Sequence, residues 1–280
     1  MKTVDTLVKD IYEVINSGVE VHEDDMKFFL SFIEEEVHNF FSKEEREKNR
    51  KPTLRMSNIG KDKRKMWYDF HEPVEYELKP NERIKFFYGH MLEAFLLFLC
   101  KEANHDVRDM QKEVSLNGIK GHIDAVIDDV VVDVKSSSSY GFKKFSRGEL
   151  FSNDPFGYVY QISGYMQALD MDEGAFLAID KQYGDLALLS VEDMSTLDAS
   201  ERIDELREIL AKGEPPERCY EEQVETNGNR KLSTECRWCH HKYNCWSDSN
   251  KGMGLRTFKY SNGYRYFTHV EKEPQVEELL

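Results

Sequence analysis

The sequence lacks an apolar stretch long enough to cross a lipid bilayer, so we expect no contact with a membrane. It also lacks an excess of basic residues, because 38 Lys and Arg stand against 53 Asp and Glu, a net charge of −15. That balance excludes a protein that coats nucleic acid non-specifically, although a local basic patch can still bind it. The first residues, MKTVDTLVKDIYEV, form a charged amphipathic pattern and not a secretory signal. We therefore expect a cytoplasmic protein.

Cysteine is scarce, and three of the five cysteines fall in the segment CRWCHHKYNC. In a reducing compartment, clustered cysteines bind metal more often than they form disulfides. The spacing C-x2-C-x5-C of Cys236, Cys239 and Cys245 therefore predicts a metal site, and thiolates suit either Zn²⁺ or an iron–sulfur cluster. Cys100 lies in an apolar helical pattern and is expected to be a core residue.

The hydrophobic periodicity predicts helices and strands in an alternating order. Helices are expected at 1–17, 23–48, 81–103, 155–170 and 194–211, and strands at 111–117, 119–127, 130–136, 174–180 and 186–191. This order predicts an α/β (α+β) fold, with a central mixed sheet flanked by helices and preceded by an N-terminal helical cap. The serine-rich stretch after the third strand is expected to be a loop.

Charged residues interrupt an otherwise apolar hairpin in the segment GHIDAVIDDVVVDVKSSSS. If the chain turns at Asp128-Asp129, Ile127 faces Val130, Ala125 faces Val132, and Asp124 faces Asp133. Like charges directly opposite one another on paired strands are destabilising, and a hard divalent cation between them would remove the repulsion. Lys135 shares a strand face with Asp133, so its ammonium group is expected at the same place. The alternative is a solvent-exposed sheet face with a salt bridge.

Two further pairs accompany this hairpin. Glu93 is a carboxylate in a mostly apolar helix, and Gly89, one turn earlier, allows a neighbour to approach closely. Gln161 and Tyr165 lie one helical turn apart, on a single face of their helix. A solvent-facing Glu or an ordinary Gln–Tyr pair would look the same in isolation.

The ordered set G-x-x-x-E, G-H-I-D, D-V-K and Q-x-x-x-Y resembles the PD-(D/E)XK nucleases over roughly residues 53 to 245. It is most similar to the RecB-type branch, which includes the lambda-type exonucleases and the iron–sulfur nucleases of CRISPR adaptation. The resemblance implies a restriction-endonuclease-like core in which Mg²⁺ or Mn²⁺ is bound by Glu93, Asp124, Asp133 and the carbonyl of Val134. Lys135 would position the nucleophilic water. Gln161 and Tyr165 would contact the substrate backbone or orient Lys135.

The function implied is a metal-dependent DNA exonuclease of recombination, repair or mobile-element DNA metabolism, in the host cytoplasm if a phage encodes it. The alternatives are a structure-specific or restriction-like endonuclease on the same core and a non-catalytic DNA-binding or adaptor subunit. The partners expected are single-stranded DNA or duplex ends, with a recombination or replication protein as a further possibility. Hydroxyl and basic side chains suit phosphate contacts, and those expected to touch DNA are Arg64, Ser136, Lys143 and Lys144.

Iron–sulfur relatives carry a fourth cysteine in a phrase like S-x-x-G-x-C-x-R-x-x-W-Y. Here the phrase is SNIGKDKRKMWY, with Asp62 at the cysteine position. The fourth ligand of a 4Fe–4S cluster, or alternatively of Zn²⁺, is therefore expected to be Cys219, with Asp62 or, for zinc, His240 or His241 as alternatives. The expected divisions are an N-terminal helical region at 1–52, the nuclease core at 53–212, a cysteine-rich segment at 213–250 and a C-terminal tail at 251–280.

Overall fold

The structure is a computed structural model that describes residues 2–42, 52–74, 78–191 and 197–279. It divides into two compact units. Unit 1 comprises Met1–Gly60 with Tyr76–Glu205, and unit 2 comprises Lys61–Glu75 with Leu206–Leu280. Among the described residues, the helices are too short or too polar for any of them to cross a membrane.

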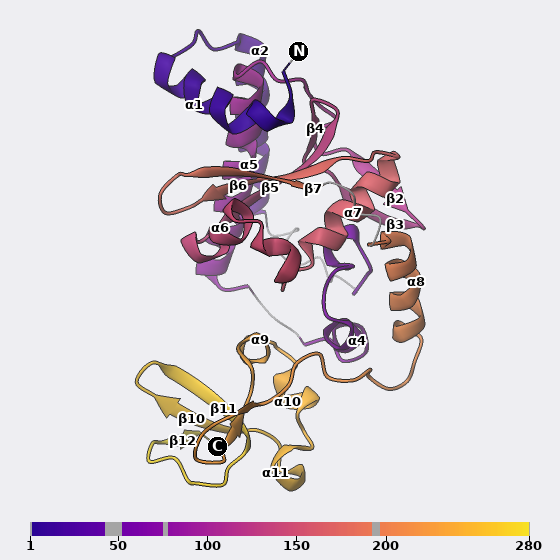
Figure 1. Cartoon of the computed structure of the whole chain (residues 1–280), viewed down its shortest axis with the longest axis vertical. Helices are drawn as coiled ribbons and strands as arrows, with labels where there is room; N and C mark the ends of the chain where they lie inside the picture. The colour runs from indigo at the N-terminus through magenta and orange to yellow at the C-terminus, as the bar shows by residue number, and fades with distance from the viewer. Residues whose placement is uncertain (1, 43–51, 75–77, 192–196, 280) are drawn as a thin grey trace. The chain divides into compact units, whose positions relative to one another are not determined.

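Unit 1 is built on a five-stranded mixed sheet in the order β1-β4-β5-β6-β7 (Figure 1). The strands are β1 (Val107–Arg108), β4 (Ala125–Ile127), β5 (Val130–Ser137), β6 (Gly174–Asp180) and β7 (Leu186–Val191). β5 and β6 run parallel, and the other neighbouring strands are antiparallel. β5 and β6 read as valine-rich or uniformly apolar runs because they are central strands covered on both faces. The expected mixed sheet flanked by helices is confirmed.

Helices cover both faces of this sheet (Figure 1). They are α1 (Leu7–Ser17), α5 (Pro80–Glu102), α6 (Ser139–Ser146) and α7 (Tyr158–Leu169), while α2 (Glu23–Phe41) packs against α5 and α8 (Ala199–Leu210) follows later in the chain. The alternate residues Val132, Val134 and Leu177 form one core with α1 and α5. On the opposite face, Phe145 of α6 packs edge-on against Phe176, with ring centroids 5.7 Å apart. Asp133 and Lys135 share the parity of that second face.

The expected strand 119–127 is wrong as one element. It is split into β3 (Ile119–His122), which pairs with β2 (Glu113–Leu116) in a separate two-stranded sheet, and β4, which pairs with β5. Between them the Ile123 N–H donates to the Lys112 carbonyl, and the Gln111 N–H donates to the Asp124 carbonyl. These two bonds turn the chain from one sheet to the other and leave Asp124 at the junction.

The expected loop after β5 is also wrong, because its residues 139–146 form α6. The Ser138 hydroxyl caps the helix by accepting the Gly141 N–H at 3.3 Å, and Phe145 anchors it to the sheet. Four consecutive serines conceal this start because only one of them is the cap. Two other expected helices extend past the described residues: 43–48 of the second helix and 194–196 of the last lie outside them.

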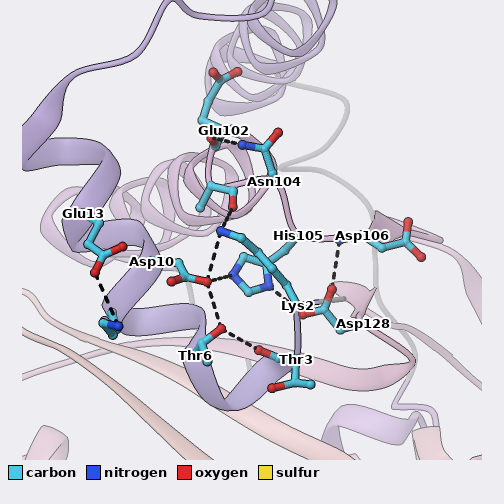
Figure 2. A network of polar contacts seen from close by, with 12 residues as sticks. Lys2, Thr3, Thr6, Asp10, Glu13, Glu102, Asn104, His105, Asp106 and Asp128 are labelled. Carbon is cyan, nitrogen blue, oxygen red and sulfur yellow. Dashed lines mark hydrogen bonds and ion pairs between the residues drawn. The ribbon is translucent and has the colours of Figure 1, made fainter.

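The turn of the β4–β5 hairpin is confirmed, with the pairs Ala125–Val132 and Ile127–Val130 in register. Asp128 and Asp129 have φ of 49° and 68°, as a two-residue type I′ turn requires. Asp128 has a second role that the sequence did not indicate. Its carboxylate lies 2.6 Å from Nδ1 of the buried His105 and accepts the Asp106 N–H at 3.0 Å (Figure 2).

The other nitrogen of His105, Nε2, lies 3.2 Å from the carboxylate of Asp10 in α1 (Figure 2). Asp10 also accepts the Thr6 hydroxyl at 2.8 Å and pairs with Lys2 at 3.1 Å. A single imidazole thus ties the N-terminal helix to the tip of the hairpin whose far end carries Asp124 and Asp133. The network fixes the hairpin from the end opposite those carboxylates.

Unit 2 contains α4 (Lys63–His71) and a second five-stranded sheet in the order β12-β10-β11-β9-β8. The strands are β8 (Gln223–Val224), β9 (Arg230–Lys231), β10 (Arg256–Tyr260), β11 (Gly263–His269) and β12 (Glu278–Leu279). Short helices α9 (Thr234–Arg237), α10 (Lys242–Cys245) and α11 (Ser249–Gly252) lie between β9 and β10 in the sequence. Phe258 and Phe267 are buried and meet edge-to-face at 5.5 Å, which gives this sheet a core of its own.

Candidate active site and cysteine segment

Asp133 and Lys135 occupy alternate positions on β5, so both side chains point to the same face of the sheet. Asp133 is 1% exposed, and its Oδ2 forms an ion pair with Nζ of Lys135. Asp124 lies immediately before β4, and its Oδ2 accepts the Val134 N–H at 2.7 Å. The Asp124 carboxylate is therefore tied to the strand that carries Asp133, although the paired residues of the hairpin end at Ala125 and Val132, one position before the expected Asp124–Asp133 pair.

Glu93 comes to the same place from α5. Its Oε1 accepts a hydrogen bond from Nε2 of Gln111 at 2.5 Å. Burial raises the pKa of Glu93 to about 7; the His90 imidazole opposes this shift, and the negative charge of Asp133 reinforces it. Gly89, one turn earlier, faces the Ser136 hydroxyl, but a Cβ there would lie 3.5 Å from it, which is an ordinary contact. α5 therefore passes the carboxyl end of β5 without needing glycine for space.

The electrostatics of the group favour a cation. Burial raises the pKa of Asp124 well above its ordinary range, and the charges of Glu93 and Asp133 raise it further. Burial also raises the pKa of Asp133, although the Lys135 ammonium opposes that shift. Burial by itself lowers the pKa of Lys135, but the carboxylates of Asp133 and Asp124 reverse this and raise it. Three carboxylates against one ammonium leave a charge of −2 when all are ionised, which fits one bound Mg²⁺ or Mn²⁺.

Gln161 and Tyr165 are brought together on α7, with exposed fractions of 9% and 2%. Nε2 of Gln161 donates to Asp133 Oδ1 at 3.2 Å and to the Tyr165 hydroxyl at 3.1 Å. The direct partner of Gln161 is therefore the Asp133 carboxylate. Gln161 therefore holds Asp133 from the α7 side of the sheet, and the Tyr165 hydroxyl accepts from the same Gln161 amide.

Two residues near the site were missed by sequence reasoning. Lys135 Nζ lies 4.7 Å from the ring centroid of Tyr158, a cation–π contact at the start of α7. Gln111, the partner of Glu93, lies in the segment before β2. Tyr158 could have been found from its place one turn before Gln161 on the same helix, whereas no local signal marks Gln111.

The expected DNA-contact residues are dispersed. Lys143 is exposed on α6, while Lys144 donates to the carbonyl and the side-chain oxygen of Asn153 at 2.9 and 3.0 Å. Ser136 is half-buried near the end of β5. Arg64 belongs to unit 2, where its Nε donates to Cys245 Sγ at 3.1 Å and its Nη1 donates to the Pro216 carbonyl.

The predicted cysteine ligands all belong to unit 2. Cys236, Cys239 and Cys245 are half-buried, and Cys219 is exposed. Burial raises the pKa of the Cys219, Cys236 and Cys239 thiols, and the nearby Cys245 sulfur adds to each shift. The four sulfurs are thus electrostatic neighbours.

The alternative ligands are Asp62, His240 and His241. Asp62 accepts the Tyr220 hydroxyl at 3.3 Å. His241 is buried with its Nε2 2.7 Å from Asp69, and its Nδ1 has no hydrogen-bond partner in the described chain. His240 is exposed, and burial of its ring atoms lowers its pKa. Among the described residues, none of these three forms a compact metal-binding group with the cysteines.

A compact metal-binding geometry, with ligand atoms within 4.8 Å of one another, occurs in the described ranges at His22, Asp25 and Glu102. Among those same residues, neither the three carboxylates around Lys135 nor the cysteines form such a group. Tetrahedral zinc with Zn–S bonds of ~2.3 Å requires sulfurs about 3.8 Å apart. The cysteines as placed do not fit a closed zinc site, and no cysteine metal cluster is formed within the described chain.

No protein-family model matches the chain, and no curated protein matches it. Among solved structures, SSO0001 is similar over 76% of this chain and 94% of its own, with 16% identity and a TM-score of 0.41. An alkaline exonuclease (LHK-Exo) from Laribacter hongkongensis matches 54% of this chain and 88% of its own, with 12% identity and a TM-score of 0.36. A phage-related exonuclease from Haemophilus somnus 129PT matches 56% and 89%, with 17% identity and a TM-score of 0.39. These similarities are distant, so the assignment of a function rests on the residues of the site.

Proposed function

We propose that the chain is a metal-dependent deoxyribonuclease that hydrolyses DNA phosphodiester bonds, as an exonuclease. The observation that carries this proposal is the meeting of Glu93, Asp124, Asp133 and Lys135, from three separate segments, in one partly buried and strongly acidic group. Structural proteins gain nothing from three confined carboxylates, because each raised pKa reports a charge that folding disfavours. A cation-dependent enzyme gains from such a group, because the cation balances the negative charge and polarises a phosphoryl oxygen.

The cation would be Mg²⁺ or Mn²⁺, held by Glu93, Asp124, Asp133 and the carbonyl of Val134. When bound, it would supply Lewis-acid stabilisation of a pentacovalent phosphorus transition state. The chain's own groups then have separate tasks. Gln161 fixes the orientation of Asp133 through its 3.2 Å hydrogen bond, and Gln111 does the same for Glu93.

Lys135 acts as a hydrogen-bond donor in this scheme and not as a base. Its pKa is raised by Asp133 and Asp124, so the side chain stays an ammonium at neutral pH and cannot take a proton from water. An ammonium can orient the attacking water or donate to a phosphoryl oxygen as negative charge develops there. The Tyr158 ring limits where this ammonium can point, because it lies 4.7 Å from Nζ.

The test is cleavage of end-labelled DNA by purified protein with Mg²⁺ or Mn²⁺. Asp133→Asn and Lys135→Met each remove one charge with little change in volume, and each is expected to lower the cleavage rate at least ~100-fold. Asp129→Asn is the matched control, because it makes the same chemical change at an exposed turn of the same hairpin, where asparagine tolerates the φ of 68°. Wild-type rates in both site variants would refute the proposal.

The form of the DNA decides between the two nuclease types. Release of mononucleotides from linear ends, with circular DNA untouched, supports the exonuclease. Cleavage of single- or double-stranded circles would show an endonuclease on the same core. Binding of DNA without any cleavage by the wild type would leave a non-catalytic DNA-binding subunit.

Although the cysteines form no compact metal group among the described residues, we further propose that Cys219, Cys236, Cys239 and Cys245 bind a 4Fe–4S cluster that stabilises unit 2. Arg64 supports this proposal, since its Nε already donates to Cys245 Sγ and such N–H···S bonds tune cluster sulfurs. Protein purified without oxygen should show a visible chromophore and stoichiometric iron, and Cys236→Ser should lose both. Cys100→Ser is the control within the same chain. Colourless protein without iron would refute the cluster.

A further inference from the structure

Unit 2 contains a cavity of about 140 Å³ that neither the carboxylate group nor the cysteines use. Residues of β8, β9, α9 and β11 line it, among them Lys231, Arg237, Tyr264, Arg265 and Tyr266. It therefore combines three cationic side chains with two tyrosine rings. All of these residues belong to unit 2.

The lining of the cavity carries a net positive charge, because among the described residues its three cationic side chains have a single carboxylate partner between them. Lys231 and Arg265 share one carboxylate, that of Glu225, at 2.7 and 3.6 Å. Arg237 contributes a third positive charge, and its Nε is buried with no hydrogen-bond acceptor among the described residues. A buried guanidinium nitrogen without an acceptor costs free energy that an anionic ligand would recover.

The net charge of unit 2 also permits an anionic ligand. Unit 2 contains equal numbers of basic and acidic residues, so the whole net charge of −15 resides in unit 1. A polyanion is therefore not repelled by unit 2 as a whole, and the local excess around Arg237 can attract it.

Exposed aromatic rings surround the cavity. Trp238, next to Arg237, is 76% exposed, and Tyr264 and Tyr243 are 47% and 50% exposed. Lys242 Nζ lies 5.4 Å from the ring centroid of Tyr243 and 4.9 Å from that of Tyr266. Flat rings interleaved with cations are the combination that single-stranded nucleic acid uses, because bases stack on the rings and phosphates meet the cations.

We propose that this cavity and the adjacent Trp238 form a binding site for single-stranded nucleic acid, with a phosphate at Arg237 and a base stacked on Trp238. The choice of DNA as the natural strand rests on the proposed nuclease function. A free phosphate would use the cations alone, and an acidic peptide would not need the exposed rings. Single-stranded nucleic acid would use both the cationic side chains and the exposed rings.

The test is fluorescence anisotropy of a labelled oligo(dT) strand with the full-length protein, without added divalent cation so that no cleavage occurs. Trp238→Ala is expected to weaken binding about 10-fold. Arg237→Gln is expected to weaken it several-fold and to reduce the slope of log affinity against log salt by about 1. The controls are Tyr183→Ala, a ring that is 69% exposed in unit 1, and Lys251→Gln, an exposed cation in unit 2, and both should bind like the wild type.

Wild-type affinity in both Trp238→Ala and Arg237→Gln would overturn the proposal. Equal competition by inorganic phosphate or by poly-glutamate, at matched charge concentration, would also overturn it. Thermal melting separates lost binding from unfolding, and the 76% exposure of Trp238 predicts an unchanged midpoint for its alanine variant. Loss of binding in these variants alongside a wild type that never cleaves DNA would support the site and refute the nuclease.

Discussion

Glu93→Gln should make the protein more stable at alkaline pH when no divalent cation is present. The Glu93 carboxyl has a pKa of about 7 against an ordinary value of 4.5, a difference that corresponds to about 3 kcal/mol. Because the folded-state pKa is raised, the contribution of Glu93 to stability is fully present below pH 4.5 and is lost as pH rises through 7. Glutamine removes the charge and keeps an oxygen that can accept the Gln111 hydrogen bond.

The measurement is urea unfolding of both proteins at pH 5 and pH 8, in buffer stripped of divalent cations. The variant is expected to be more stable than the wild type by up to ~3 kcal/mol at pH 8 and nearly equal to it at pH 5. Mn²⁺ at 100 times its Kd would add about 2.7 kcal/mol to the wild type and much less to the variant, so the gap should close. Glu20→Gln, at an exposed position, is the control. A variant less stable than the wild type at pH 8 without metal would refute the assignment of Glu93 to the acidic group.

Three further outcomes are expected. The apparent affinity for Mn²⁺, measured by calorimetry, should rise up to 10-fold per pH unit below pH 7, because Glu93 must lose its proton to bind; a flat profile would contradict this. Gly157→Ala should cost roughly 2–3 kcal/mol more in urea unfolding than Gly184→Ala, since both have φ of 77° but only the first Cβ would lie 2.3 Å from opposing backbone. His105→Ala should cost ~1–3 kcal/mol by removing the buried imidazole that Asp10 and Asp128 share, and Asp128→Asn should cost less; unchanged stability of His105→Ala would contradict this.

Local rules were enough to predict the β4–β5 hairpin. Side chains alternate with a period of two along a strand, and Asp-Asp accepts the positive φ values of a two-residue turn, so the register follows from the sequence. The same parity places Asp133 and Lys135 on one face. Helical spacing likewise brings Gln161 beside Tyr165.

Such local rules did not predict other parts of the molecule. α6 begins inside a run of serines, and its formation depends on Phe145 finding Phe176 of a distant strand. The strand expected at 119–127 divides because its two halves pair with different neighbours, β2 for the first half and β5 for the second. The sheet of unit 2 consists of short strands whose apolar residues become a core only when they meet.

The sequence by itself determined which residues are candidates for the site and how the central hairpin aligns, because the register depends on residues within the hairpin itself. Only the tertiary structure decided that Gln161 holds Asp133, that Gln111 holds Glu93, and that His105 secures the hairpin tip. It also determined the pKa values of the Glu93 and Asp124 carboxyls, which are raised by burial and by charges on separate segments. Burial and long-range charge are properties of the packed chain, and no local pattern encodes them.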